Sequence, residues 1–349
     1  MDYSRHIIST DASVKEALAA INALSGESMT LFAIDPDNHL VGTVTDGDVR
    51  RALLRGVALT DPVSKAMHRK FLAIHPKDNI LSRMAEGRKR KLSLLPVLDK
   101  EGHILEILDL RTVKTMLPID AVLMAGGKGE RLRPLTLKTP KPLLPVGGKP
   151  IIDYNIEELE RCGVKRIFIT TNYLADKIEK YMAKRKGIAT VECVREPRRL
   201  GTMGSLALIE GLQSDNVLMM NSDLLTTINF EAMYLHHISN KCDLTMAGVP
   251  YTVSVPYALM RIKNGRVKGL EEKPTYNYFA NAGVYILKRR LIEKVTKGEF
   301  LDAPDFISSL IDAGGKVGCY PIEGTWIDIG SPNDYRYANE LMERRHGML

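Results

Sequence analysis

The sequence has few cysteines and no long apolar run. Its 349 residues include four cysteines, which are widely spaced and form no Cys-x-x-Cys pair, so the sequence indicates neither a disulfide framework nor a cysteine-based zinc site. No apolar run approaches the roughly 20 residues that a membrane helix needs. The first residues, MDYSRHIIST, also lack the basic and apolar regions of a secretory signal. We therefore expect a cytoplasmic protein with no membrane partner.

A large excess of one charge is also missing. The formal charge of +7 is small for this length, so composition gives no reason to expect nucleic acid as a partner. Positive charge is instead concentrated between Met124 and Lys149, where six Lys or Arg accompany a single acid, Glu130. A basic segment of this kind suits a small polyanionic ligand.

The chain is long enough for two domains, and its pattern changes near residue 117. Residues 1–117 contain two weakly similar units, which begin TDASVKEALAAINALSG and HPKDNILSRMAEGRK. For each unit the pattern predicts an amphipathic helix, a strand, a turn, a second strand and a closing helix. A repeat of about 60 residues indicates a pseudo-symmetric module that mixes α and β structure.

These two units resemble a pair of CBS domains. In that family a Thr or Ser and an Asp three residues later hold a nucleotide, and Thr45 and Asp48 match this pattern in the first unit. The aligned positions of the second unit are Leu108 and Arg111, so the resemblance implies at most one regulatory nucleotide site. Asp48 could instead cap a helix that begins near Val49, which would leave the pair a structural or dimerising role. Because CBS pairs commonly associate across a two-fold axis, we expect a homo-oligomer.

From Ile119 onward, short apolar strands alternate with helical patterns. This alternation predicts an α/β domain over residues 118–349 with a Rossmann-like, mainly parallel sheet covered by helices on both faces. In such sheets ligands bind at the carboxyl ends of the strands. The glycines after AVLMA, Asp223 in NSD and Glu196 in CVREP all fall at such ends.

The segment 123–146, LMAGGKGERLRPLTLKTPKPLLPV, is the strongest candidate for binding phosphate. Its spacing excludes a Walker loop, because Lys128 is followed by glycine rather than Ser or Thr. It also excludes a dinucleotide fingerprint, because the sixth position counted from Gly127 is Leu132. The glycines let the backbone approach a ligand, and Arg131 and Lys141 add positive charge beside it.

This segment resembles the signature of the sugar-nucleotidyltransferases, also called nucleotide-sugar pyrophosphorylases. Further segments match in the family's order: EPRRLGTMGSL, NSD, EEKP, NAGVY and WIDIG. The resemblance covers roughly residues 119–339 and implies the fold of the nucleotide-diphospho-sugar transferases. It also implies a reaction in which a sugar 1-phosphate attacks the α-phosphorus of a nucleoside triphosphate (NTP) and pyrophosphate leaves.

The resemblance assigns a role to each matching residue. It implies catalytic roles for Arg131, Lys141 and Asp223, and Mg²⁺ ligation by Asp223 and Asp328, since Mg²⁺ takes oxygen ligands. The residues expected to bind the nucleotide are Met124, Ala125, Gly126, Gly127, Gly129, Glu196, Gly201 and Thr202. Those expected to bind the sugar phosphate are Glu272, Lys273, Asn281 and Gly283. Each aspartate could alternatively be a cap or turn residue, and Glu271–Lys273 a solvated charged turn.

The base is suggested by Glu196. An ionised carboxylate only accepts hydrogen bonds and could take both N1–H and the 2-amino group of guanine, which favours GTP, with cytosine next. Glu196 could instead pair with Arg198 or Arg199 and read no base. A CBS pair followed by a short transferase domain resembles guanylyltransferases of bacterial surface-glycan or nonulosonate-type sugar pathways. Mannose, glucosamine and heptose 1-phosphates all remain compatible acceptors.

Other functions stay open at this point. The chain could be a cytidylyl-, uridylyl- or thymidylyltransferase acting on a sugar 1-phosphate or on phosphocholine. It could also be a non-catalytic nucleotide sensor, although such a protein would be expected to lose Arg131, Lys141 or the two aspartates. His236 and His237 fall in a helical pattern and are expected at its surface.

Overall fold

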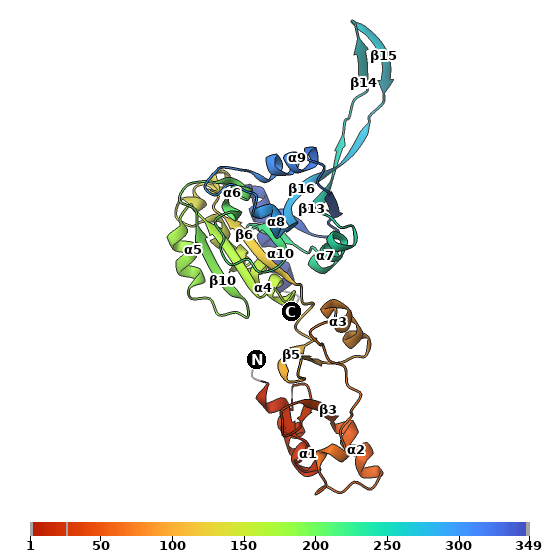
Figure 1. Ribbon diagram of the computed structural model, residues 1–349. Helices are drawn as coiled ribbons and strands as arrows, with labels where there is room; N and C mark the ends of the chain where they lie inside the picture. Colours follow the sequence, from red (N-terminus) through yellow and green to blue (C-terminus); the bar gives the residue numbers. More distant parts are fainter. Residues whose placement is uncertain (1–2, 26, 347–349) are drawn as a thin grey trace. The chain divides into compact units, whose positions relative to one another are not determined.

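The computed structural model describes residues 3–25 and 27–346. The chain divides into two compact units, 1–116 and 117–349 (Figure 1). The division lies one residue before the predicted boundary. Leu117 belongs to the second unit because its N–H donates a hydrogen bond to the carbonyl of Cys162.

The first unit consists of two pseudo-repeats. The first repeat contains β1 (Ile7–Ser9), α1 (Val14–Ala23), β2 (Thr30–Ile34), β3 (Leu40–Thr45) and α2 (Asp46–Leu54), and its strands form one sheet in the order β1-β2-β3. The second contains α3 (Ile80–Lys89) and the antiparallel pair β4 (Leu94–Leu98) and β5 (Ile104–Asp109). Phe32 and Leu40 of the first repeat pack with Leu94 and Ile107 of the second. The predicted smaller module that precedes the main sheet is therefore confirmed.

The closing helix predicted for the second repeat is wrong, because residues 110–116 contain a turn followed by irregular chain. In the first repeat Thr45 caps α2 by accepting the N–H of Asp48. The aligned Leu108 has no side-chain oxygen with which to cap a helix. Arg111 instead turns back on Asp109, whose carboxylate accepts both the backbone N–H and the guanidinium of the arginine.

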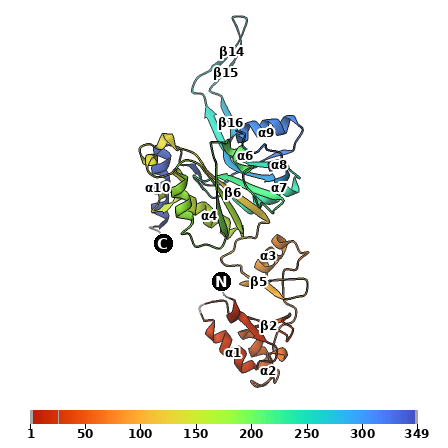
Figure 2. The ribbon, with the colours of Figure 1, turned by 60° about the vertical axis from the view of Figure 1, so that its left-hand side comes forward.

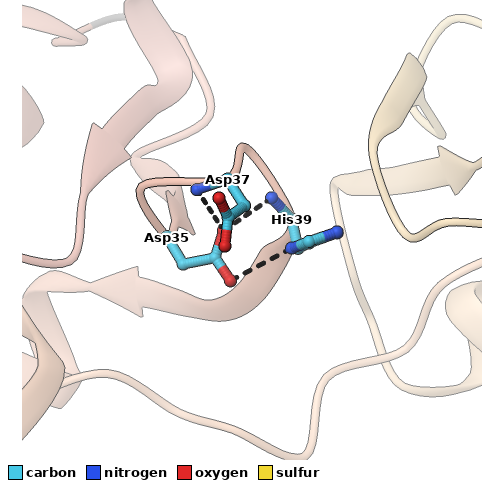
Figure 3. A group of neighbouring side chains, drawn as sticks. All are labelled: Asp35, Asp37 and His39. Carbon is cyan, nitrogen blue, oxygen red and sulfur yellow. Dashed lines mark hydrogen bonds and ion pairs between the residues drawn. The ribbon is translucent and has the colours of Figure 1, made fainter.

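Matching turns close the two hairpins of this unit. Asp35 accepts the N–H groups of Asp37 and His39 at 3.0 and 2.9 Å, and the ring of His39 donates to its second oxygen (Figure 3). Asp99 holds His103 in the same way, and the two imidazoles stack with centroids 4.8 Å apart. Asp35, Asp37 and His39 lie close enough to share a metal ion. The hydrogen bonds of Asp35 already explain the group as a turn.

The second unit is built on a seven-stranded sheet in the order β10-β9-β6-β11-β16-β13-β17 (Figures 1 and 2). Its neighbouring strands are parallel except on the two sides of β16, which is antiparallel to both β11 and β13. The predicted mainly parallel α/β sheet is thus confirmed. The strands are β6 (Ile119–Ala125), β9 (Arg166–Thr171), β10 (Thr190–Arg195), β11 (Asn216–Asn221), β13 (Leu244–Ser254), β16 (Thr275–Lys288) and β17 (Val317–Pro321).

Helices cover this sheet and short strand pairs surround it. Val122, Phe168 and Val217 pack with α6, α8 and α9 in one apolar cluster. The helices are α4 (Ile151–Arg161), α5 (Ala175–Met182), α6 (Gly201–Leu206), α7 (Phe230–Ser239), α8 (Arg289–Ile292), α9 (Ala303–Asp312) and α10 (Pro332–His346). The small antiparallel pairs are β7 (Pro145–Val146) with β8 (Lys149–Pro150), β12 (Leu224–Thr226) with β18 (Trp326–Asp328), and β14 (Leu259–Lys263) with β15 (Arg266–Glu271). None of the described helices is both long and apolar enough to cross a membrane.

The prediction that His237 lies at the surface is wrong. The side chain projects from α7 into the protein and is fully buried. Its Nδ1 lies 2.8 Å from Thr245 Oγ1 and its Nε2 lies 3.2 Å from Asn216 Oδ1. Burial lowers the pKa of this histidine to about 4, so the ring is a neutral core group near pH 7.

A two-stranded arm projects from this unit. Beyond Gly248 and Asn281, β13 and β16 leave the body of the sheet as a ribbon, which ends in the β14–β15 hairpin (Figures 1 and 2). The ribbon begins at an irregularity in the ladder: Met246 pairs with Tyr285, but Gly248 pairs with Asn281. The extra residues on β16 include Gly283, whose φ of 69° suits glycine. Such bulges bend a strand.

Candidate active site

Two adjoining cavities open at the carboxyl ends of the parallel strands. Their volumes are about 210 and 490 Å³, and five residues line both of them. The shared residues are Gly126, Gly127, Lys141, Arg199 and Asp223. The first cavity is also lined by Met124, Ala125, Pro142, Thr170, Glu196, Gly201, Thr202, Asn221, Ser222 and Asp302. The second is also lined by Lys128, Gly129, Glu130, Arg131, Asn172 and Gly330.

The glycines after β6 shape the shared wall of the cavities. A Cβ on Gly126 would lie 2.6 Å from Glu196 Oε1, so a larger residue would displace that carboxylate. A Cβ on Gly127 would meet no described atom within 4 Å, which leaves its backbone open to the cavity. Gly129, with φ of 60°, precedes the turn Glu130–Leu132 that presents Arg131. Backbone N–H groups in such a loop suit an anionic ligand.

Lys141 lies between two carboxylates. Its ammonium is 3.0 Å from Asp328 Oδ1 and is also paired with Asp223 Oδ2. The side chains of Lys141, Asp223 and Asp328 are 12%, 20% and 35% exposed. Burial lowers the pKa of Lys141, but the two carboxylates outweigh it and the pKa is raised. Burial, opposed by Lys141 and reinforced by Asp328, raises the pKa of Asp223.

Strand pairing brings these three residues together from distant parts of the chain. Asp223 lies between β11 and β12, and the next residue, Leu224, pairs directly with Asp328 of β18. Trp326 of β18 in turn donates its Nε1–H to the carbonyl of Ala282 in β16. Lys141, which is 187 positions from Asp328, begins a short 3-10 turn after Pro140.

The two aspartates suit a divalent cation. Asp223 Oδ1 is buried and has no hydrogen-bond partner among the described residues. Its other oxygen and Asp328 Oδ1 share one cationic group, the Lys141 ammonium. Carboxylate oxygens in such a cluster are the ligands that Mg²⁺ prefers. This donor set therefore fits a hard divalent ion.

Glu196 forms part of the wall of the first cavity and is buried. Its Oε2 accepts the N–H of Leu200 at 3.0 Å, and among the described residues Oε1 has no hydrogen-bond partner. Burial raises its pKa, although the Leu200 N–H and the Arg199 charge oppose this. Arg198 donates to the carbonyl of Gly298. In the described chain neither arginine forms an ion pair with Glu196, so one of its oxygens is open to a ligand.

Gly201 and Thr202 are held against the start of α9. The Thr202 N–H donates to Asp302 Oδ1 at 3.2 Å, and Thr202 Oγ1 accepts the N–H of Ala303 at 2.7 Å. Gly201 has φ of 75°, and a Cβ there would lie 2.6 Å from Asp302 Oδ1. Both residues line the first cavity beside Asp302.

Of the residues expected to bind the sugar phosphate, Gly283 lies beside the first cavity, because a Cβ there would be 2.5 Å from Nδ2 of Asn221, which lines that cavity. Glu272 and Lys273 are exposed at the base of the β14–β15 hairpin and line neither cavity. No hydrogen bond or ion pair joins either side chain to another described residue. The amide of Asn281 is engaged with Tyr285 Oη and the Gly283 N–H inside the bulge of β16. The structure therefore brings together the residues expected to bind the nucleotide and leaves Glu272 and Lys273 outside the two cavities.

Several lining residues were missed by the sequence interpretation. Arg199 lines both cavities, and Asn172, Asn221 and Asp302 each line one. Arg199 stands in EPRRLG and could have been found as a second fixed charge near the phosphates. Asp302 lies in no segment with a distinctive pattern, and only the packing of α9 against α6 brings it to the site.

The first unit contains a cavity of its own, of about 260 Å³. Thr45 lines it, together with Phe71 and the basic residues Lys70 and Arg90. Asp48 does not line it. The carboxylate of Asp48 accepts the Thr45 hydroxyl at 2.6 Å and the Thr45 N–H, as part of the capping box of α2.

Sequence profiles of two families match this chain, one in each unit. The sequence profile described as nucleotidyl transferase matches residues 120–345, and that of the CBS domain matches residues 2–55. The chain is 31% identical over 228 residues to the mannose-1-phosphate guanylyltransferase of Mycobacterium tuberculosis, a match that covers 62% of each chain. It is 29% identical over 228 residues to the D-glycero-alpha-D-manno-heptose 1-phosphate guanylyltransferase of Aneurinibacillus thermoaerophilus, with coverage of 64% of this chain and 99% of the relative.

Solved structures of a related protein superimpose on this chain. HddC from Yersinia pseudotuberculosis superimposes with a TM-score of 0.53 and 28% identity, over 64% of this chain and 99% of HddC. HddC complexed with GMP-PN superimposes with a TM-score of 0.52 and 27% identity, over 64% of this chain and 99% of HddC.

Proposed function

Because the chain belongs to the nucleotidyl transferase family and carries a CBS domain in its first unit, we propose that it joins an NTP to a sugar 1-phosphate. The products are a nucleoside-diphosphate sugar and pyrophosphate, and the favoured NTP is GTP. The proposal includes a place in a bacterial surface-glycan or nonulosonate-type pathway.

One observation carries the proposal: Lys141 and Asp223 line both cavities and so stand where the two cavities join. In the reaction, an oxygen of the sugar 1-phosphate bonds to the α-phosphorus, and the bond from that phosphorus to the bridging oxygen of the β-phosphate breaks. The nucleoside would occupy the first cavity and the β- and γ-phosphates the second. The α-phosphorus then lies beside Lys141, which neutralises charge where two anions meet.

The second cavity supplies the groups that hold the leaving pyrophosphate. Arg131 and the backbone N–H groups of Gly127 and Gly129 would stabilise charge as it develops on the leaving oxygens. Asp223 and Asp328 would hold a divalent cation, for which we propose Mg²⁺. When bound, such a cation neutralises phosphate charge and orients the phosphates. No described side chain needs to form a covalent intermediate.

Selection of guanine is assigned to Glu196. Glu196 lines the first cavity and its Oε1 has no partner among the described residues, so it is an acceptor that suits the N1–H and 2-amino donors of guanine. A site built around such a hydrogen bond discriminates strongly, because the wrong base leaves a buried carboxylate oxygen unpaired. The relatives named as guanylyltransferases and the GMP-PN complex of HddC support the same base.

Pyrophosphate release tests the proposal directly. The full chain should be assayed with Mg²⁺, with each of the common triphosphates, and with mannose, heptose and glucosamine 1-phosphates and phosphocholine. We expect release with GTP and a sugar phosphate. Glu196→Gln should lower the preference for GTP over CTP and UTP by at least tenfold while the melting temperature is kept. Absence of release with every pair would refute the enzyme assignment.

We also propose that the cavity of the first unit binds a regulatory nucleotide. Lys70 and Arg90 supply positive charge for its phosphate, and Phe71 offers an aromatic face to its base. Thr45 would contact the nucleotide directly, whereas Asp48 would act through Thr45. Addition of AMP, ATP or GMP should then shift activity or melting temperature. If none of them changes either quantity, the CBS unit has only a structural or assembly role.

A further inference from the structure

The β14–β15 hairpin at the end of the arm has one apolar face. The cross-strand register puts Met260 opposite Leu270 and Ile262 opposite Val267. Alternation places Met260 and Ile262 on one side of β14, and the register shift after Arg261 brings their partners Leu270 and Val267 to that side as well. These four side chains are 53–67% exposed. The other side carries basic residues such as Arg261. Because the hairpin has two strands only, nothing in its own sheet covers the apolar side.

The ribbon that leads to the hairpin also has an apolar, aromatic face. Tyr251 pairs with Tyr278 and Val253 pairs with Tyr276, so all four lie on one face. Tyr276 and Tyr278 are in contact, with ring centroids 6.4 Å apart. A two-stranded ribbon is at best marginally stable alone in water. Exposed apolar patches of this kind mark interfaces between proteins.

The exposed area can be compared with that of an interface. On one face of the ribbon Tyr251 and Tyr278 are 60% and 57% exposed, whereas Phe279, the next residue along the strand, belongs to the opposite face. Since an aromatic side chain presents roughly 150–250 Å², Tyr251 and Tyr278 together expose on the order of 200 Å². The hairpin residues add to this. A standard interface buries about 800 Å² on each partner, so the arm supplies a substantial part of the area that a stable dimer needs.

The arm also carries Glu272 and Lys273, two of the residues expected to bind the sugar phosphate, away from the cavities. From Asn281 the ribbon continues for six residues to Thr275, or about 20 Å at 3.3 Å per residue. Glu272 and Lys273 lie beyond that point, exposed and without a hydrogen bond or ion pair to other described residues. The ladder is continuous from Gly248 to Ser254, and the arm projects away from the body of the sheet in both views (Figures 1 and 2). These two side chains therefore do not reach the cavities of their own chain.

We propose that the arm packs on a second copy of this chain and places Glu272 and Lys273 at the acceptor side of that copy's cavities. Each active site is then completed by the arm of the other subunit. Glu272 accepts hydrogen bonds from the sugar hydroxyls, and the Lys273 ammonium pairs with the sugar phosphate. A two-fold axis makes the exchange reciprocal, so both apolar faces are covered and both sites are completed. This inference rests on the proposed function, which supplies the acceptor.

Subunit mixing tests the exchange. One copy carries Asp223→Asn, which removes a cavity carboxylate. The other, with a different tag, carries Glu272→Ala and Lys273→Asn, chosen because asparagine tolerates the left-handed φ of 41° at that position. The two are co-expressed, and the heterodimer is purified through both tags. Completion by the partner leaves one intact site, so the heterodimer should show about half of the wild-type turnover per dimer. Completion within each chain leaves none, so turnover close to that of the separate variants would overturn the proposal.

The oligomeric state provides a readout that needs no activity. Met260→Asp with Leu270→Asp should convert the wild-type dimer to a monomer in sedimentation equilibrium, whereas Arg261→Ser on the opposite face should leave it dimeric. A monomeric wild type, or a dimer that survives the double substitution, would overturn the arm interface whatever else the arm binds. If the wild-type chain forms this dimer but releases no pyrophosphate, the proposed function fails and the exchange of acceptor residues fails with it, while the arm interface is retained.

Discussion

Replacement of Lys141 by methionine tests whether its ammonium holds Asp223 and Asp328 together and whether these two carboxylates bind a divalent cation. The substitution keeps the length of the side chain but leaves Asp223 and Asp328 facing each other without the ammonium. Removing one partner of a buried pair typically costs 3–5 kcal/mol. Because the three side chains are partly exposed, we expect a smaller loss than this, about 2–3 kcal/mol of unfolding free energy at pH 7–8.

The loss should depend on pH and on divalent cations. Without the ammonium the pKa of Asp223, already raised, rises further. The folded variant then binds a proton more tightly than the unfolded chain, so the deficit is present above that pKa and shrinks as the pH falls through it. Mg²⁺ should also restore stability, by about 2.7 kcal/mol at a hundred times its dissociation constant. The wild type should gain less, because the cation must displace the ammonium.

The protein offers a direct probe for this experiment. Its single tryptophan, Trp326, lies in β18 two residues before Asp328, so urea unfolding followed by its fluorescence reports on the second unit. Lys149→Met is a matched control, because Lys149 forms an ion pair with Glu157 at 2.7 Å and lines neither cavity. We expect a change below about 1 kcal/mol there. Equal losses in the two variants, or no Mg²⁺ effect on Lys141→Met, would refute the assignment. Turnover of Lys141→Met should fall at least a hundredfold.

Three further predictions follow from single residues. Gly126→Ala should raise the KM for GTP about tenfold with an unchanged melting temperature, because its Cβ would lie 2.6 Å from Glu196 Oε1. An unchanged KM in steady-state assays would argue against recognition of the base by the Glu196 carboxylate. The pKa of His237 is about 4 in the folded protein, and in the unfolded chain it is about 6.5. As the pH falls from about 6.5 to 4, the unfolded chain binds this proton more tightly than the folded protein does, so the unfolding free energy should drop by roughly 3 kcal/mol. His237→Gln should flatten that slope in urea titrations, and an unaltered slope would contradict it. Arg90→Ala should abolish any nucleotide-induced shift in melting that Lys89→Ala, an exposed neighbour outside the cavity, retains.

The central sheet and the nucleotide side of the site could be predicted because local rules decide them. Alternating apolar strands and helical patterns are enough to indicate a parallel sheet, and its strand ends locate the glycine loop and Asp223. Gly126 had to be small because the backbone passes close to Glu196. Constraints of this kind leave a pattern in the sequence.

Other features depend on contacts that no local pattern records. The pairing of Leu224 with Asp328 joins distant strands, and only the motif resemblance indicated that the two aspartates meet. The helical pattern of α7 did not indicate that His237 is buried, because its partners Thr245 and Asn216 come from two different strands. Residues 110–116 of the second repeat form no closing helix, and the position aligned with the cap residue Thr45 is Leu108, a difference that a repeat pattern hides.

The bulge in β16 separates the two segments that are expected to bind the sugar phosphate, EEKP and NAGVY. Trp326 fixes the carbonyl of Ala282 beside the strand that carries Asp328, so the NAGVY segment stays in the body of its own subunit. On the other side of the bulge the same strand leaves the sheet, and the EEKP segment leaves with it. The strand that bends at Gly283 therefore carries the EEKP segment away from the body of the sheet, in which the NAGVY segment stays (Figure 1). In our proposal the second copy compensates for this separation, and transfer then requires assembly: a monomer could hold the nucleotide and the cation but would lack Glu272 and Lys273 to hold the acceptor.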